Sequence, residues 1–280
     1  MDRILREREG YIKRKLSHLL FEILEYPAKR EVLYIALCYC QLSRAWGADE
    51  IPLSELKRCL GRYGIDFDLY RWRDYLLELE LFYMRDNGDN LVKGTALMTY
   101  TPTDKTALSI DPRYGFLKGS FCQRVYRYWY ISGRWASFNS PRSGWEVIDN
   151  AVRLLNEGLY GESALYLDDY LPYLSQEPQL LLYRVLKGLA NLGEALESGD
   201  TASARGEINH LLGFLKEFKR ELKGVPYDLK KLSKDLKILE KRLKHPRRSL
   251  YTEPLKVERK KKVSLKGFLK KLLRGLPIFR

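Results

Sequence analysis

The side chains best suited to binding chemistry lie between Asp111 and Glu146, where basic and aromatic residues alternate and no acidic residue occurs. Aromatic rings stack on unpaired bases and guanidinium groups bind phosphate, so this composition is typical of an RNA-binding surface. The alternative is that the rings join two domains and the arginines stack on them. The basic residues are Arg113, Lys118, Arg124, Arg127, Arg134 and Arg142. The aromatic residues are Tyr114, Phe116, Phe121, Tyr126, Tyr128, Trp129, Tyr130, Trp135 and Phe138. Arg113, Arg124, Arg127 and Arg134 are our candidates for RNA contacts.

The three histidines offer no catalytic or metal-binding arrangement. His18, His210 and His245 lie on different predicted elements, and none has another His or Cys at ligand spacing. Phosphate-binding glycine loops and nucleophile elbows are also missing from the sequence. We therefore expect a protein that is not an enzyme, with no catalytic residues, no metal and no cofactor.

The four cysteines, Cys38, Cys40, Cys59 and Cys122, include no Cys-x-x-Cys pair. Cys38 and Cys40 are two residues apart on a predicted helix, so they point about 200° apart and cannot bond to each other or share a metal. We expect buried free thiols in a reducing compartment. The sequence also has no signal peptide and no apolar run of about 18 residues, which predicts a cytoplasmic protein.

The positive charge is concentrated at the C-terminal end. The formal net charge is +14, and residues 241–280 hold fifteen Lys/Arg against two acids, which leaves about +1 for residues 1–240. A basic segment of this kind indicates a polyanionic partner. The candidate nucleic-acid contacts in this tail are Arg247, Arg248, Arg259, Lys260, Lys261, Lys262, Lys266, Lys270, Lys271 and Arg274.

The tail has two predicted parts. Residues 247–262 form an extended basic linker that cannot bury enough surface to fold alone. Ser264 then caps a basic amphipathic helix over residues 265–274. Such a helix fits an anionic membrane surface, a hydrophobic protein groove, a ribonucleoprotein or its own body. We expect the ribonucleoprotein and do not expect a membrane.

Residues 31–102 have the order of elements found in a winged helix. The pattern predicts helices over residues 31–46, from Ser54 onward and over residues 69–82, with a short extended piece at residues 51–53. Two strands then flank the turn-forming Asn87-Gly88-Asp89. This order resembles the winged-helix family, in which the third helix enters the DNA major groove.

That resemblance places Arg71 and Arg73 at the DNA-reading positions, with Arg85 and Lys93 in the wing. Residues 30–100, however, carry nine Lys/Arg against eleven acids. Because DNA affinity begins with the neutralisation of phosphates, a net charge of −2 favours protein contacts at this domain. The amphipathic helix predicted over residues 2–25 packs on this domain or on a second copy of it, so we expect a homodimer.

The helical part of the chain begins near Trp145. The residues Asn156, Glu157, Gly158, Tyr160 and Glu162, followed by Lys187-Gly188-Leu189 and Gly199-Asp200, resemble the family called domain of unknown function 309. Its signature, His-x-x-x-Glu-x-x-Trp, implies a metal or hydrolase site. The signature is degenerate here, since the corresponding positions are Ala164, Asp168 and Leu171.

Helix pairs of this kind also resemble tetratricopeptide-like hairpins, which bind other proteins. A leucine seam over residues 229–243 is predicted to dock on the preceding helices or to pair across a dimer.

These observations predict a mainly α protein, with a winged helix-turn-helix domain, a C-terminal helical-hairpin domain and a basic amphipathic tail. The divisions are residues 1–102, a connecting segment at 103–145, a helical domain at 146–245 and the tail at 246–280. We expect a ribonucleoprotein-binding factor that regulates translation on the ribosome. The rival is a dimeric DNA-binding transcription regulator, and a third possibility is a metal-dependent hydrolase by family analogy.

Overall fold

The computed structural model is mainly helical, as the sequence predicts. It divides into two compact units, Met1–Ser140 and Pro141–Arg280. The structure describes residues 2–66, 81–86, 90–92, 101–103, 105–135, 138, 140–244 and 256–258.

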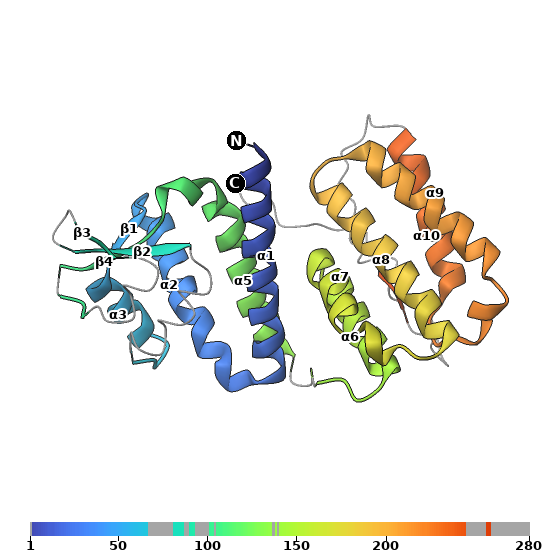
Figure 1. Ribbon diagram of the computed structural model, residues 1–280, viewed down its shortest axis with the longest axis horizontal. Helices are drawn as coiled ribbons and strands as arrows, with labels where there is room; N and C mark the ends of the chain where they lie inside the picture. The colour runs from blue at the N-terminus through green and yellow to red at the C-terminus, as the bar shows by residue number, and fades with distance from the viewer. Residues whose placement is uncertain are drawn as a thin grey trace. The chain divides into compact units, whose positions relative to one another are not determined.

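In the first unit α2 packs against α3 and α5, and it buries an apolar set made of Leu33, Ile35, Ala36, Leu37, Cys38, Tyr39 and Cys40. α1 ends before Pro27, as predicted, and buries Ile12, Leu16, Leu20 and Ile23. It packs against α5 of its own unit (Figure 1). The helices are α1 (Asp2–Glu25), η1 (Pro27–Arg30), α2 (Glu31–Trp46), α3 (Leu53–Gly61), η3 (Pro112–Leu117) and α5 (Lys118–Arg134).

A small antiparallel sheet lies beside α2 and α3, which it contacts through β1 (Figure 1). Its strands are β1 (Glu50–Pro52), β2 (Phe82–Asp86), β3 (Asn90–Val92) and β4 (Ala107–Ile110), in the order β1-β4-β2-β3. The hairpin of β2 and β3 is confirmed, with Met84 opposite Val92. β4 was not predicted, because it is a strand only through its pairing with β1 and β2, which lie far from it in the sequence.

Two predictions for this unit need correction. Ser54 does not cap α3, because the helix starts at Leu53 and the Leu53 amide donates to the Thr106 carbonyl at 2.9 Å. The segment 103–145 is more than a connection between two domains, because it contains β4 and α5, which are part of the first unit. The third predicted helix and the far part of the wing lie outside the described residues.

The cysteines are paired, so the expectation of free thiols is wrong. Cys38 bonds to Cys59 of α3, and Cys40 bonds to Cys122 of α5 with an S–S distance of 2.05 Å. The opposite directions of Cys38 and Cys40 on α2, which prevent a bond between them, give each a different helix as its neighbour. Both disulfides therefore start from α2.

The second unit is a series of helices in which each packs against the next (Figure 1). Ser143 caps the first of them and Asp200 caps the fourth α-helix, while Gly158 and Gly199 make turns with positive φ. The elements are α6 (Gly144–Asn156), α7 (Tyr160–Asp169), η4 (Leu171–Tyr173), α8 (Glu177–Glu197), α9 (Thr201–Glu217), η5 (Glu221–Gly224) and α10 (Leu229–Lys244).

The leucine seam of α10 docks on its own unit. Leu232, Leu236, Leu239 and Leu243 are buried, and α10 packs along α9. Arg205 of α9 donates to the Leu243 carbonyl at 3.0 Å and so caps the end of α10. Of the two alternatives for the seam, the structure has the intramolecular one.

Candidate nucleic-acid interface

The Arg/aromatic segment folds mainly as η3 and α5, and three of its nine rings are buried. Phe121, Tyr128 and Phe138 are buried in the first unit. Phe116 and Tyr130 remain exposed, each at 54%. The three buried rings are therefore closed to stacking with a base, while Tyr114, Tyr126, Trp129 and Trp135 are half-buried.

Two arginines of this segment already bind neighbouring side chains of the protein. Arg113 forms an ion pair with Asp111 at 2.6 Å, and these hydrogen bonds and the charge of Asp111 raise the pKa of the Arg113 guanidinium. Arg124 donates to the Tyr128 hydroxyl at 3.2 Å. A guanidinium that already has a carboxylate or hydroxyl partner has fewer donors left for a phosphate.

Arg134 and Tyr130 form the pair that best matches the predicted RNA-binding surface, because an exposed guanidinium lies next to an exposed ring. Arg134 donates to the Tyr130 hydroxyl at 2.9 Å and lies 5.0 Å from the ring centroid, at the exposed C-terminal end of α5. Arg127, on the same helix, is half-buried. Arg134 is therefore a predicted contact of this segment that has an exposed aromatic neighbour.

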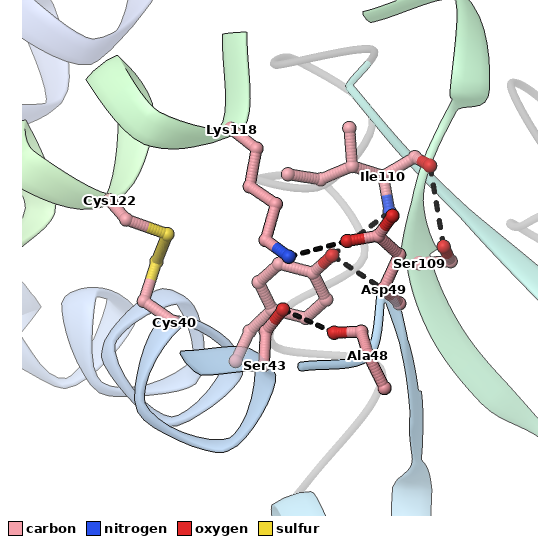
Figure 2. Close-up of polar contacts among 9 residues, drawn as sticks. Cys40, Ser43, Ala48, Asp49, Ser109, Ile110, Lys118 and Cys122 are labelled. Atoms are coloured by element: carbon pink, nitrogen blue, oxygen red, sulfur yellow. Dashed lines mark hydrogen bonds and ion pairs between the residues drawn. A yellow bond between two sulfur atoms is a disulfide. The ribbon is translucent and has the colours of Figure 1, made fainter. Parts of the chain in front are cut away.

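A polar cluster fixes the start of α5 to the sheet and to α2. The Tyr39 hydroxyl donates to the Asp49 carbonyl at 2.9 Å and accepts from the Ile110 amide at 3.4 Å. Lys118 forms an ion pair with the Asp49 carboxylate, beside the Cys40–Cys122 disulfide (Figure 2).

Burial raises the pKa of Tyr39, so its hydroxyl stays protonated as a donor. Ser43 of α2 completes the cluster by donating to the Ala48 carbonyl (Figure 2). Each of these groups is used to join helices and strands, which makes the cluster a structural junction and not a binding site.

Arg30 fixes the other half of α5, and the sequence analysis missed it. Its guanidinium donates to the Ser132 hydroxyl at 2.9 Å and to the Trp129 carbonyl at 3.0 Å. A Cβ at Gly133 would lie 2.6 Å from this guanidinium, so the glycine leaves the space that Arg30 fills. Arg30 directly follows Pro27–Lys29 in a 3-10 turn, a position with no recognisable sequence signal.

The remaining predicted contacts lie outside the described residues. This holds for Arg71 and Arg73, and for Arg247, Arg248, Arg259, Lys260, Lys261, Lys262, Lys266, Lys270, Lys271 and Arg274 of the tail. Three residues of the tail, 256–258, are described, and they contradict part of the linker prediction. Val257 is buried, although residues 247–262 were expected to bury little.

Val257 is held by the side chain of Asn156 at the end of α6. The Asn156 amide donates to the Val257 carbonyl at 3.0 Å and accepts from the Val257 amide at 2.8 Å. The neighbouring Glu258 accepts from the Asp228 amide at 2.8 Å through its carbonyl and pairs with Lys231 at 2.7 Å. We call residues 256–258 with these partners the tail clamp.

The residues behind the family resemblance have packing roles in this structure. Tyr160 lies against Gly193, Gly188 faces Leu211, and Glu162 is buried. Asp168, at a signature position, accepts from the Tyr183 hydroxyl at 2.8 Å and pairs with Lys187 at 2.7 Å. Burial, and then this hydrogen bond, raises the pKa of Tyr183.

Among the described residues, no group of three or more His, Cys, Asp or Glu side chains could hold a metal ion. Asp168 joins α7 to α8 through its contacts with Tyr183 and Lys187, and it belongs to no such group in the part of the chain that the structure covers.

The chain is similar to an uncharacterized protein of Aquifex aeolicus (strain VF5). The two are 25% identical over 223 residues, which cover 75% of this chain and 70% of the relative. No protein-family model and no solved structure matches the chain. These comparisons do not assign a function, so the function has to be argued from the residues.

No helix in the described ranges has both the length and the apolar character needed to cross a bilayer.

Proposed function

We propose that this chain is a non-enzymatic factor that binds RNA within a ribonucleoprotein, and that it acts on the ribosome as a regulator of translation. The observation that carries the proposal is the tail clamp. Asn156 and Lys231 hold residues 256–258 on the second unit, and nine Lys/Arg without a single acid follow in residues 259–280. Glu258, the residue that precedes these cations in the sequence, is therefore held beside α10.

A near-neutral body with a strongly basic end fits a particle made of RNA and protein. Phosphate contacts supply affinity that does not depend on sequence, and the helical surface of the body remains for protein contacts. Arg134 and Tyr130 at the end of α5 add one place where a guanidinium and an exposed ring are adjacent. Base stacking at such a pair is typical of RNA recognition.

The second candidate is a dimeric DNA-binding regulator, favoured by the order α2, β1, α3, β2, β3, which resembles a winged helix. One of its proposed contacts is already occupied. Arg85 in β2 forms an ion pair with Glu50 in β1 at 2.9 Å. A phosphate would have to compete with this carboxylate, so the observation weighs against DNA binding through the wing.

Cytoplasmic localisation remains part of the proposal, but the cysteines no longer support it. Disulfides persist in oxidising compartments, and the known exception is the intracellular proteins of hyperthermophilic bacteria and archaea. A ribosome-bound protein with Cys38–Cys59 and Cys40–Cys122 intact would therefore belong to that exception.

The proposal is tested by sedimentation of the tagged protein from cell lysate through a sucrose gradient, at low and high salt and with and without nuclease. The full chain should travel with ribosomal subunits, and less so at high salt. Deletion of residues 259–280 leaves the tail clamp in place and should abolish co-sedimentation.

The matched control is Arg85→Ala, which should change nothing because that guanidinium is paired within the sheet. Absence of the full chain from every ribosomal fraction, together with sequence-dependent binding to duplex DNA that Arg85→Ala weakens, would overturn the proposal in favour of the regulator.

A further inference from the structure

α10 exposes a straight stripe of lysines on the side opposite its leucine seam. Lys230, Lys234, Lys237 and Lys241 follow one another at spacings of four, three and four residues, and all four are exposed. On a helix with 3.6 residues per turn this spacing places them on one face. With a rise of 1.5 Å per residue, the stripe is about 16 Å long. The leucines of α10 are buried against α9, so the face with the lysines points away from α9.

The four ammonium groups have no ion-pair partner among the residues that the structure describes. Lys231 on the flank, by contrast, pairs with Glu258. The acids of α10, Asp235 and Glu240, lie by helical geometry between the stripe and the leucine seam. A surface helix usually intersperses both signs of charge on its solvent face, which lowers the field it presents. This face presents cations alone.

The stripe is covalently continuous with the basic tail. Glu258 is bound at the first turn of α10, through Lys231 and through the Asp228 amide. In the sequence, Glu258 is followed directly by four consecutive cations, of which Arg259 is the first. The tail clamp therefore holds Glu258, the residue that precedes these cations in the sequence, at the N-terminal end of the lysine stripe.

We infer that the lysine stripe of α10 is a docking surface for the phosphate backbone of RNA. This inference rests on the proposed function and names the part of the body that the RNA contacts. No aromatic residue occurs in α10, so the surface positions the backbone without reading bases. Each lysine that neutralises a phosphate releases a counterion, which makes the contribution measurable through salt.

The test uses the purified full-length chain and a short fluorescent RNA hairpin, with the dissociation constant measured over a range of salt concentrations. The variant carries Lys230→Gln, Lys234→Gln, Lys237→Gln and Lys241→Gln, changes that keep helix propensity nearly constant. The slope of log affinity against log salt should fall by about three to four, since each phosphate contact contributes nearly one.

A control with the same net charge separates a site from a general charge effect. Four exposed cations on other elements are exchanged for Gln in this control, namely Arg14, Arg62, Lys105 and Arg184. Its slope should change by less than one. Equal slopes in the two variants would overturn the inference, because net charge alone would then explain the binding.

Two further outcomes separate this inference from the proposed function. If deletion of residues 259–280 weakens RNA binding while the four-lysine variant binds like the wild type, the stripe is not a docking surface and the proposed function stands. If the wild-type chain does not bind the hairpin but binds phosphatidylserine vesicles through these lysines, the inference and the proposed function both fall.

Discussion

The side chain of Asn156 binds both backbone groups of Val257, a residue 101 positions further along the chain. One amide side chain here acts as the neighbouring strand would in a sheet, satisfying a donor and an acceptor at once. Val257 is itself buried, so this short contact fixes the chain direction at the point where the basic tail begins.

Removal of Asn156 should release the tail clamp. In Asn156→Ala the buried Val257 amide and carbonyl lose their partners, which costs about 1 to 3 kcal/mol if they stay buried. The segment should therefore detach, and trypsin should cut the Lys256–Val257 bond, which the clamp protects in the wild type. Mass spectrometry of a short trypsin digest measures this. Asn191→Ala removes an exposed asparagine of α8 and should leave the bond protected. Equal cleavage in wild type and Asn156→Ala would contradict the clamp.

The two disulfides should stabilise the first unit unequally. Cys40–Cys122 closes a loop with a sequence separation of 82, and Cys38–Cys59 one of 21. The chain-entropy argument assigns about 4.5 and about 3 kcal/mol to loops of these sizes. Chemical unfolding of Cys40→Ser/Cys122→Ser and Cys38→Ser/Cys59→Ser should show the larger loss in the first pair. Four reactive thiols in the denatured, unreduced wild type would show instead that neither bond forms.

Tyr39 should make the protein sensitive to alkali. Its pKa is raised in the folded state, mainly by burial, so the folded protein holds this proton more firmly than the unfolded chain. The contribution is complete below the unfolded pKa of about 10 and is lost as the pH rises above it. Tyr39→Phe should lower stability near neutral pH by about 1 kcal/mol, because its hydrogen bonds are lost, and should flatten the decline at high pH. Thermal unfolding between neutral and alkaline pH measures both effects.

The exposed Tyr173 provides the comparison for Tyr39, since Tyr173→Phe should follow the wild-type curve. A Tyr39→Phe protein with the same alkaline decline as the wild type would mean that another group causes it.

Two glycines of the second unit should respond to alanine with opposite signs. A Cβ at Gly193 would lie 2.3 Å from the ring of Tyr160, so Gly193→Ala should destabilise by about 1 to 3 kcal/mol as α7 and α8 move apart. Gly213 in α9 has nothing within 4 Å of the corresponding position, and Gly213→Ala should stabilise by about 0.5 to 1 kcal/mol through helix propensity. The melting temperatures of the two variants measure both effects. If Gly213→Ala lowered the melting temperature as much as Gly193→Ala, the loss at Gly193 would not need a close contact with Tyr160.

The parts of the fold with a strong local pattern could be predicted. The apolar run of α2, the stripe of α1 that stops before Pro27 and the Asn-Gly turn between β2 and β3 each depend on neighbouring residues only. β4 could not be predicted in the same way, because its identity as a strand depends on β1 and β2, which lie far away in the sequence.

The candidate site was less predictable for a related reason. Val257 is one apolar residue in a basic segment, and no pattern in the neighbouring sequence predicts that Asn156 binds it. The spacing of Lys230, Lys234, Lys237 and Lys241 is visible in the sequence. Only the burial of the leucine seam against α9 shows which face of α10 remains open. For α5 the prediction failed in the other direction. The mixture of basic and aromatic residues suggested exposed rings, but Phe121 and Tyr128 are buried.

The position of both disulfides on α2 has a consequence for biosynthesis. Cys59 leaves the ribosome 63 residues before Cys122, which at 5 to 20 residues per second is an interval of about 3 to 13 s. During that interval Cys40 has no native partner, while Cys38 and Cys59 are both present. Disulfide formation takes seconds to hours, so a slow oxidant lets α5 arrive first, whereas a fast one can trap Cys40 on Cys59. Correct maturation of the first unit then requires thiol exchange, and its yield depends on how quickly the surroundings oxidise the nascent chain.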